Sequence, residues 1–259
     1  MPVSRYHSYP NSAIQILQLY KGEEPRLYGR QAFASFIKKY FSGNKKYGST
    51  DRKQIAHLCY CYFRLGKALS DIPINEKILT GLFLCSTEQN EMLEQLKPEW
   101  NKKVNTSIEE KYSPPAGRAG IFNNQYSIFN VFPWKDELSD GIEYEKFCGS
   151  FFIQPDLFIR IRPGNAENVL LKLNSLRVNY EFISPFTIRL PNSFKANQHF
   201  SLDKEIVVQD YSSQRVVEFL PVRRGPSDRV WDCCAGSGGK SIMIYDINSK
   251  VKLSVSDVR

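Results

Sequence analysis

The sequence lacks the features that would place it in a membrane or send it out of the cell. No apolar run approaches the ~18 residues that a membrane-spanning helix needs. Ile78–Cys85 is among the longest, and it contains Thr80 and Gly81. Met1–Pro10 has no apolar stretch of the signal-peptide type. We therefore expect a soluble, cytoplasmic protein without a membrane partner.

Metal-binding spacings of cysteine and histidine are also missing. The six cysteines form no C-x2-C pair, and the three histidines lie far apart in the chain. We therefore expect reduced thiols and no metal site. A composition of 42% hydrophobic and 24% charged residues excludes a disordered chain, and 259 residues suggest two domains or three small ones.

Acidic residues are outnumbered, 27 against 35 Lys and Arg, which gives a formal net charge of +8. From Arg26 to Lys67 there are ten basic residues and one acidic residue, whereas Asp71–Glu110 has eight acids and four bases. The basic excess predicts a surface that faces a polyanion such as RNA, and the alternative is a solvated basic face. Arg160 and Arg162, on the polar face of a predicted strand, would extend that surface. Its other predicted RNA-binding residues are Lys38, Lys39, Lys45, Lys46, Arg52 and Lys53.

Residues 1–112 are predicted to form a helical bundle. Apolar residues recur at spacings of three and four from Leu27 to Phe41 and from Ile55 to Leu65, which is the period of one helical face. Ser86–Gln89 and Ser107–Glu110 have the spacing of a capping box, so helices are expected to begin there.

The remaining chain divides into three predicted parts. Prolines in Ser113–Gly117 end the helical pattern and open a connector over 113–155 that carries one short helix. The pattern over 156–204 indicates β-α-β-β, a small α+β module that matches half of a ferredoxin-like sheet. Residues 205–259 end in strand, glycine-rich turn, helix and strand, the opening of a doubly wound α/β sheet.

The turn Asp232–Ser241 can hold a ligand, since glycines let backbone N–H groups approach it and a helix start attracts negative charge. Three interpretations compete. A Walker A loop fits Gly239–Ser241, but Cys234 stands where its first glycine belongs. A dinucleotide loop of G-x-G-x-x-G form has Ser241 in place of its third glycine. The third is an S-adenosylmethionine site, with Asp257 after the next strand as the ribose ligand.

A family resemblance favours the third interpretation. Asp232–Ser241 resembles motif I of the RsmB/Sun (Nol/Nop/Sun) family of RNA cytosine-5 methyltransferases, although Ser237 stands where many members have proline. Val208–Gln214 is similar to the family's V-Q-D-x-x-S-Q segment, and Leu157–Gly164 to its strand after the helical part. Ser49–Leu65 resembles part of the NusB-like RNA-binding domain of bacterial members.

The resemblance implies methylation of cytosine C5 in RNA with S-adenosyl-L-methionine as cofactor, and ribosomal RNA as the substrate. It implies a multidomain α and α/β protein: a NusB-like bundle over 1–112, an RRM-like module over 156–204 and the start of a Rossmann-like methyltransferase domain over 205–259. The implied cofactor-binding residues are Cys234, Ala235, Gly236, Ser237, Gly238, Gly239, Lys240 and Asp257.

The family's chemistry uses two cysteines, one to attack C6 of cytosine and one to assist release of the covalent adduct. They lie after the fourth and fifth strands of the catalytic sheet, and Cys233 and Cys234 are not substitutes for them. We therefore expect this chain to be the N-terminal portion of a longer monomeric enzyme, inactive by itself and without a catalytic residue. The alternatives are a non-catalytic RNA-binding module and a P-loop nucleotide-binding protein.

Overall fold

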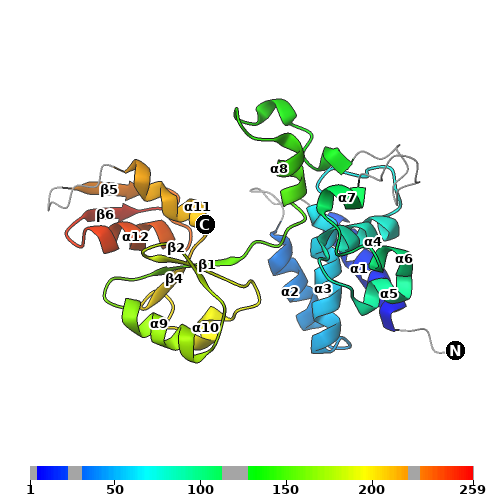
Figure 1. Cartoon of the computed structure of the whole chain (residues 1–259), viewed down its shortest axis with the longest axis horizontal. Coiled ribbons are helices and arrows are strands. Elements are labelled where there is room, and N and C mark those ends of the chain that lie inside the picture. The colour runs from blue at the N-terminus through cyan, green and yellow to red at the C-terminus, as the bar shows by residue number, and fades with distance from the viewer. Residues whose placement is uncertain (1–4, 23–30, 113–127, 221–227, 259) are drawn as a thin grey trace. The chain divides into compact units, whose positions relative to one another are not determined.

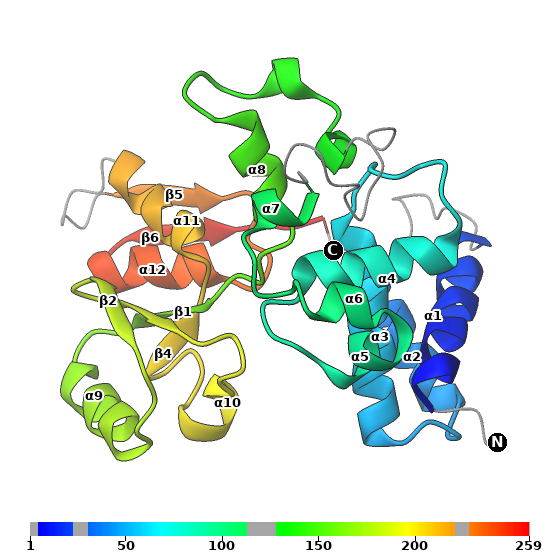
Figure 2. The ribbon, with the colours of Figure 1, turned by 45° about the vertical axis from the view of Figure 1, so that its right-hand side comes forward.

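The structure is a computed structural model that describes residues 5–22, 31–112, 128–220 and 228–258. The chain forms two compact units, residues 1–154 and 155–259. Helices make up the first unit, and the second combines helices with two sheets (Figures 1 and 2). This confirms the multidomain α and α/β architecture. Among the described residues, no helix is long and apolar enough to cross a membrane.

The described part of the first unit, the helical unit, contains eight α-helices and two short 3₁₀ turns. They are α1 (Arg5–Gly22), α2 (Phe33–Gly43), α3 (Ser49–Arg64), α4 (Ile74–Cys85), α5 (Glu91–Leu96), α6 (Pro98–Asn101), α7 (Ile108–Tyr112), η1 (Ile128–Val131), η2 (Lys135–Glu137) and α8 (Tyr144–Ser150).

The core of the helical unit is apolar and continuous. The predicted periodicity is confirmed, because α2 and α3 each turn one apolar face inward and Leu58 of α3 is fully buried. Helix α4 packs closely on α3 at Gly81, where a Cβ atom would lie 2.6 Å from the carbonyl oxygen of Cys61. Glycine at this position therefore allows the two backbones to approach.

The two predicted capping boxes have different outcomes. The one at Ser107 is confirmed: its Oγ accepts from the Glu110 backbone N–H at 3.2 Å, and Glu110 Oε2 accepts from the Ser107 N–H at 3.0 Å. The one at Ser86 is wrong, because Ser86 closes α4 and its Oγ donates to the Leu82 carbonyl. Asn90 caps α5 instead, accepting from the Leu93 N–H at 3.0 Å.

The described part of the predicted connector, 128–154, belongs to the helical unit. Val131, Cys148 and Phe152 are buried in its core. The Tyr144 hydroxyl donates to the Phe132 carbonyl at 2.7 Å. Apolar burial thus makes this segment part of the bundle, while 113–127 lies outside the described residues.

The second unit contains a four-stranded antiparallel sheet in the order β2-β3-β1-β4. Its apolar face packs on α9 and α10, around Ile159, Leu173 and Ile188. The predicted module boundary at 204 is wrong, since β4 lies beyond it and pairs with β1. The elements are β1 (Leu157–Ile161), α9 (Ala166–Ser175), β2 (Glu181–Ser184), β3 (Thr187–Leu190), α10 (Ala196–His199) and β4 (Ile206–Val208).

The last part of the chain is a parallel strand pair with one helix. The predicted strand-turn-helix-strand is confirmed as β5 (Arg229–Asp232), α12 (Gly239–Ile247) and β6 (Lys252–Val255). A short helix α11 (Tyr211–Gln214) and a 3₁₀ turn η3 (Arg215–Phe219) come before it. Helix α12 lies between the two sheets (Figures 1 and 2).

Candidate functional site

The glycine-rich turn joins the end of β5 to the start of α12. Gly236 and Gly238 have φ of +54° and +84°, a left-handed conformation that glycine adopts without strain. The Gly238 N–H donates to the Ala235 carbonyl at 2.8 Å, and the Ala235 N–H donates to the Ser256 carbonyl at 3.1 Å. The turn is therefore tied to the chain after β6.

Asp257 lies beside this turn. Its Oδ2 accepts from the Gly236 backbone N–H at 2.7 Å, across 21 residues of sequence. Strands β5 and β6 are parallel neighbours, so the turn after one and the acid after the other meet at the same edge. The structure thus brings together the loop and the acid that the sequence predicts as one site.

Two polar residues that are not among the predicted cofactor-binding residues fix the base of the turn. Asp232 and Ser241 are both buried, and the Ser241 hydroxyl donates to Asp232 Oδ2 at 2.6 Å. This contact joins the end of β5 to the first turn of α12. In a Walker A loop the hydroxyl at this position binds Mg²⁺. The inward hydrogen bond of Ser241 disfavours that interpretation.

Gln209 connects the turn to the antiparallel sheet. It is buried, its Oε1 accepts from Nε of Arg160 at 3.2 Å, and its side chain lies 3.5 Å from where a Cβ of Gly239 would stand. Gln214 Nε2 donates to the Gln209 carbonyl at 2.8 Å and its Oε1 accepts from Thr187 Oγ1 at 2.6 Å. The V-Q-D-x-x-S-Q segment therefore holds the two layers of the second unit together.

The pKa of the Cys234 thiol, at the turn, is raised rather than lowered. Cys233 and Cys234 are exposed, and the neighbouring Cys233 thiol raises the pKa of Cys234. In the helical unit, burial raises the pKa of Cys59 to about 12. A raised pKa keeps a thiol protonated, whereas a nucleophilic cysteine reacts as the thiolate.

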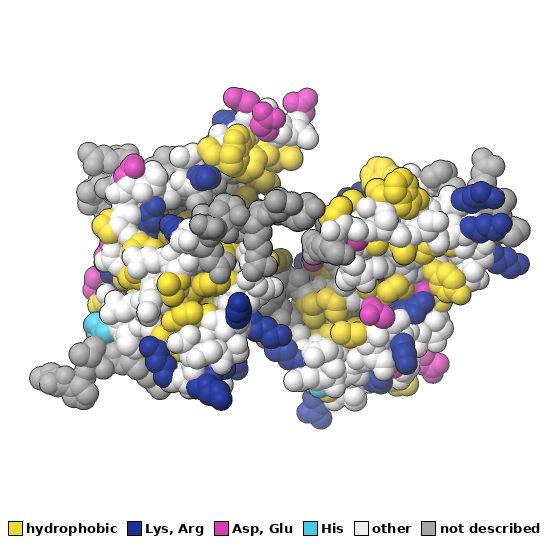
Figure 3. Space-filling model, turned by 180° about the vertical axis from the view of Figure 1, so that it is seen from behind, with side chains coloured by type: hydrophobic (Ala, Val, Ile, Leu, Met, Phe, Trp, Pro, Cys, Tyr) yellow, Lys and Arg dark blue, Asp and Glu magenta, His cyan; other side chains and the backbone are white. Residues whose placement is uncertain are grey.

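The predicted RNA-binding lysines lie where α2 ends and α3 begins. Lys38, Lys39, Lys45, Lys46 and Lys53 are exposed. Figure 3 shows basic side chains gathered at the lower edge of the helical unit, where this end of α2 and α3 lies. Arg52 differs, because its Nε donates to the Tyr47 carbonyl at 2.9 Å and it is half-buried. The structure thus places five of the six predicted cations of the helical unit at the surface.

Arg160 and Arg162 do not extend this surface. Arg160 in β1 and Arg162 directly after it share one face as predicted, but α12 covers that face. Nη1 of Arg160 and Nη2 of Arg162 both donate to the carboxylate of Asp246, the latter at 2.7 Å. Arg160 is buried, with 8% of its side chain exposed. The predicted exposure of this pair was therefore wrong, since alternation along a strand does not tell what packs on each face.

No protein-family model matches the chain, and no curated protein matches it. A solved structure described as the crystal structure of PH0851 is similar over 100% of this chain, with a TM-score of 0.51 and 13% sequence identity. The match covers 65% of the PH0851 chain, so this chain spans just under two thirds of its length. At this identity the similarity concerns the fold alone.

Within the described ranges, no three His, Cys, Asp or Glu side chains come close enough to hold a metal ion. The candidate site is the turn at the end of β5 with Asp257 beside it, and the exposed lysines of the helical unit form a second candidate surface.

Proposed function

We propose that this chain is the RNA-binding and cofactor-loop portion of an S-adenosylmethionine-dependent RNA cytosine-5 methyltransferase, with ribosomal RNA as the substrate. One observation carries the proposal: a left-handed glycine turn between parallel strands has the carboxylate of Asp257 against its Gly236 N–H, at 2.7 Å. This is the arrangement in which a nucleoside-containing cofactor binds at the carboxyl edge of an α/β sheet.

The residues of the turn fit S-adenosylmethionine. A Cβ atom at Gly236 or Gly238 would meet nothing within 4 Å, so the open space beside this backbone can take a ligand. The backbone from Cys234 to Lys240 would hold the methionine part, and Asp257 would accept hydrogen bonds from the ribose hydroxyls. When bound, the cofactor would supply the methyl group.

The element order supports the modules of the proposal. The β-α-β-β-α-β order with strands arranged β2-β3-β1-β4 is that of a ferredoxin-like, RRM-like module. The parallel β5–β6 pair with α12 fits the start of a Rossmann-like sheet. For the helical unit, a NusB-like RNA-binding role is supported by the exposed lysines at the α2–α3 end.

Cofactor binding tests the first half of the proposal. In the full-length protein, Asp257→Ala should weaken S-adenosylmethionine by about tenfold or more, because a hydrogen bond to a charged group contributes ~1.5–3 kcal/mol and tenfold is ~1.4 kcal/mol. Titration calorimetry measures the dissociation constant of S-adenosylmethionine for each variant. Glu181→Gln, which changes an exposed carboxylate on β2, is the matched control. Equal affinity of the Asp257 variant and wild type would exclude Asp257 from the site.

Salt-dependent RNA binding tests the second half. Changing Lys38, Lys39, Lys45 and Lys46 to Gln should flatten the plot of log K against log salt by about two units or more, since each phosphate contact contributes ~0.7–0.9. A fluorescence anisotropy titration with a structured RNA at several salt concentrations gives the slope. The control removes the same charge from exposed lysines elsewhere in the helical unit: Lys102, Lys103, Lys135 and Lys146. If both variants keep the wild-type slope, the lysines at the α2–α3 end are a solvated face only.

A further inference from the structure

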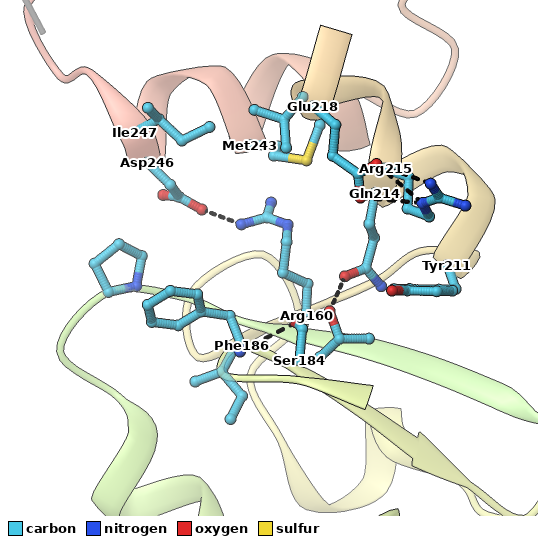
Figure 4. Close-up of a pocket in the computed structure, with 14 residues that line it drawn as sticks. Arg160, Ser184, Phe186, Tyr211, Gln214, Arg215, Glu218, Met243, Asp246 and Ile247 are labelled. Atoms are coloured by element: carbon cyan, nitrogen blue, oxygen red, sulfur yellow. Dashed lines mark hydrogen bonds and ion pairs between the residues drawn. The ribbon is translucent and has the colours of Figure 1, made fainter. Parts of the chain in front are cut away.

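The second unit contains a cavity of about 540 Å³ between the antiparallel sheet and α12. Figure 4 shows its walls: the β2–β3 hairpin with Phe186 on one side, α11 and η3 on another, and Met243, Asp246 and Ile247 of α12 opposite the sheet. Its volume lies within the ~300–1,000 Å³ that is typical of small-molecule sites. The contacts described above leave this cavity without an assigned role.

A buried guanidinium lies at the inner wall. Nε of Arg160 donates to Gln209, and Nη1 donates to Asp246. Nη2 has no hydrogen-bond partner. Among the described residues, every other buried side-chain nitrogen or oxygen has one. Arginine stays protonated in proteins, so this nitrogen requires an acceptor.

The ion pairs at the cavity leave one donor of Arg160 unused. Arg160 pairs with Asp246 through Nη1, and at the rim Arg215 pairs with Glu218 at 2.9 Å. Nη2 of Arg160 stays without an acceptor. A buried donor on a charged group is unfavourable without a partner, so the cavity favours a ligand that brings an acceptor oxygen, and most of all an anionic one.

We propose that this cavity binds a small organic carboxylate with an apolar body. The unpartnered guanidinium nitrogen matches the oxygen of a carboxylate, because a hydrogen bond between two charged groups is stronger than one between neutral groups. The walls around Arg160 are largely apolar, with Phe186, Met243 and Ile247 among them. Met243 lies beside the guanidinium (Figure 4), and this flexible side chain can turn aside to let a carboxylate reach Nη2.

The site is separate from the proposed cofactor loop. The loop precedes Gly239 at the start of α12, while the cavity is lined by Met243, Asp246 and Ile247 in its second half. At ~1.5 Å of rise per residue, the start of the helix and Asp246 are ~10 Å apart along its axis. The inference therefore stands whether or not the chain binds S-adenosylmethionine.

The experiment uses 3-phenylpropionate as the probe, with 3-phenylpropionamide as its neutral analogue and inorganic phosphate as the anion without an apolar body. Titration of the 259-residue chain, followed by NMR chemical shifts, should show the carboxylate binding about tenfold more tightly than the amide or phosphate. The proposal is overturned if the acid and the amide bind equally. It is also overturned if the acid shows no binding at about 5–10 mM, the concentration at which the weakest relevant affinity would be seen.

Two variants with matched controls locate the probe. Arg160→Met should weaken 3-phenylpropionate about tenfold, while Arg189→Gln, which removes an exposed charge of the same sheet, should not. Because Arg160→Met removes a buried ion pair, circular dichroism checks its fold, and the exposed Phe186→Ala provides a second variant. It should weaken binding about threefold, and Phe182→Ala, on β2 outside the cavity, should have no effect. Equal losses in a variant and its control would also overturn the proposal.

Discussion

The helical unit and the second unit are held together by different interactions. The interior of the helical unit is built from side chains such as Ile55, Leu58 and Phe83, which are fully buried and apolar. Between the antiparallel sheet and α12, the second unit instead buries Arg160 and Gln209 with their hydrogen-bonding partners. Apolar packing makes a rigid scaffold, whereas buried polar groups are stable only when each finds a partner. Among its described residues, the helical unit buries one charged side chain, Lys111, against backbone carbonyl oxygens, whereas the second unit buries an ion pair between its layers.

Within the second unit, the two sheets also differ. The antiparallel sheet covers an apolar core around Ile159 and Ile188. On the parallel pair, Trp231 and Val255 remain 69% and 58% exposed. The β5–β6 pair thus depends more on specific contacts, such as that between Ser241 and Asp232 at 2.6 Å, than on apolar burial.

The largest effect is expected from removing the buried carboxylate. Asp246→Ala leaves Arg160 and Arg162 without their counter-charge, and breaking a buried ion pair from one side destabilises by ~3–5 kcal/mol. Native-state hydrogen exchange of the β1 and β3 amides measures the loss in the second unit. Glu181→Ala breaks an exposed pair with Arg189 and should lose under ~1 kcal/mol. Equal losses in the two variants would remove the distinction between buried and exposed charge.

A smaller effect is expected where the helical unit packs most closely. Gly81→Ala would place a Cβ atom 2.6 Å from the Cys61 carbonyl oxygen, so α3 and α4 must move apart, with a loss of ~1–3 kcal/mol. Hydrogen exchange of the α3 and α4 amides measures this loss of stability. At Gly43 a Cβ atom meets nothing within 4 Å, and Gly43→Ala should change stability by less than ~0.5 kcal/mol. A Gly81 variant as stable as the Gly43 variant would contradict the close approach.

The smallest effect concerns pH. The hydrogen bond from Lys172, at 2.6 Å, is the main cause that lowers the pKa of Glu205 below its ordinary value of 4.5. The unfolded carboxyl therefore takes up its proton first, and stability present above pH 4.5 is lost as the pH falls through the folded pKa. Acid unfolding followed by circular dichroism should show Glu205→Gln losing less stability below pH 4.5 than wild type. Glu88→Gln, in the helical unit, should keep the wild-type acid response of the second unit, and a Glu205 variant with that same response would refute the assignment.

Much of the fold follows from local pattern. The periodicity of α2 and α3, the capping box at Ser107 and the turn between β5 and α12 are set by residues close in sequence. The pairing of β4 with β1 is set by contacts more than 40 residues apart, at Ile159 and Val208. Local pattern therefore placed the boundary of the module before β4, because a three-residue strand gives no sign of which neighbour it joins.

For the candidate site, the sequence by itself determined the glycine turn and the acid after the following strand, since the parallel order of β5 and β6 brings both to one edge. Only the tertiary structure decided which groups the side chains of Arg160 and Arg162 contact. Alternation put Arg160 and Arg162 on one face of β1, and the packing of α12 then set Asp246 against them. A side chain's neighbours within a strand are fixed by the pleat, whereas the charge it meets across a layer depends on a helix 84 residues further along the chain.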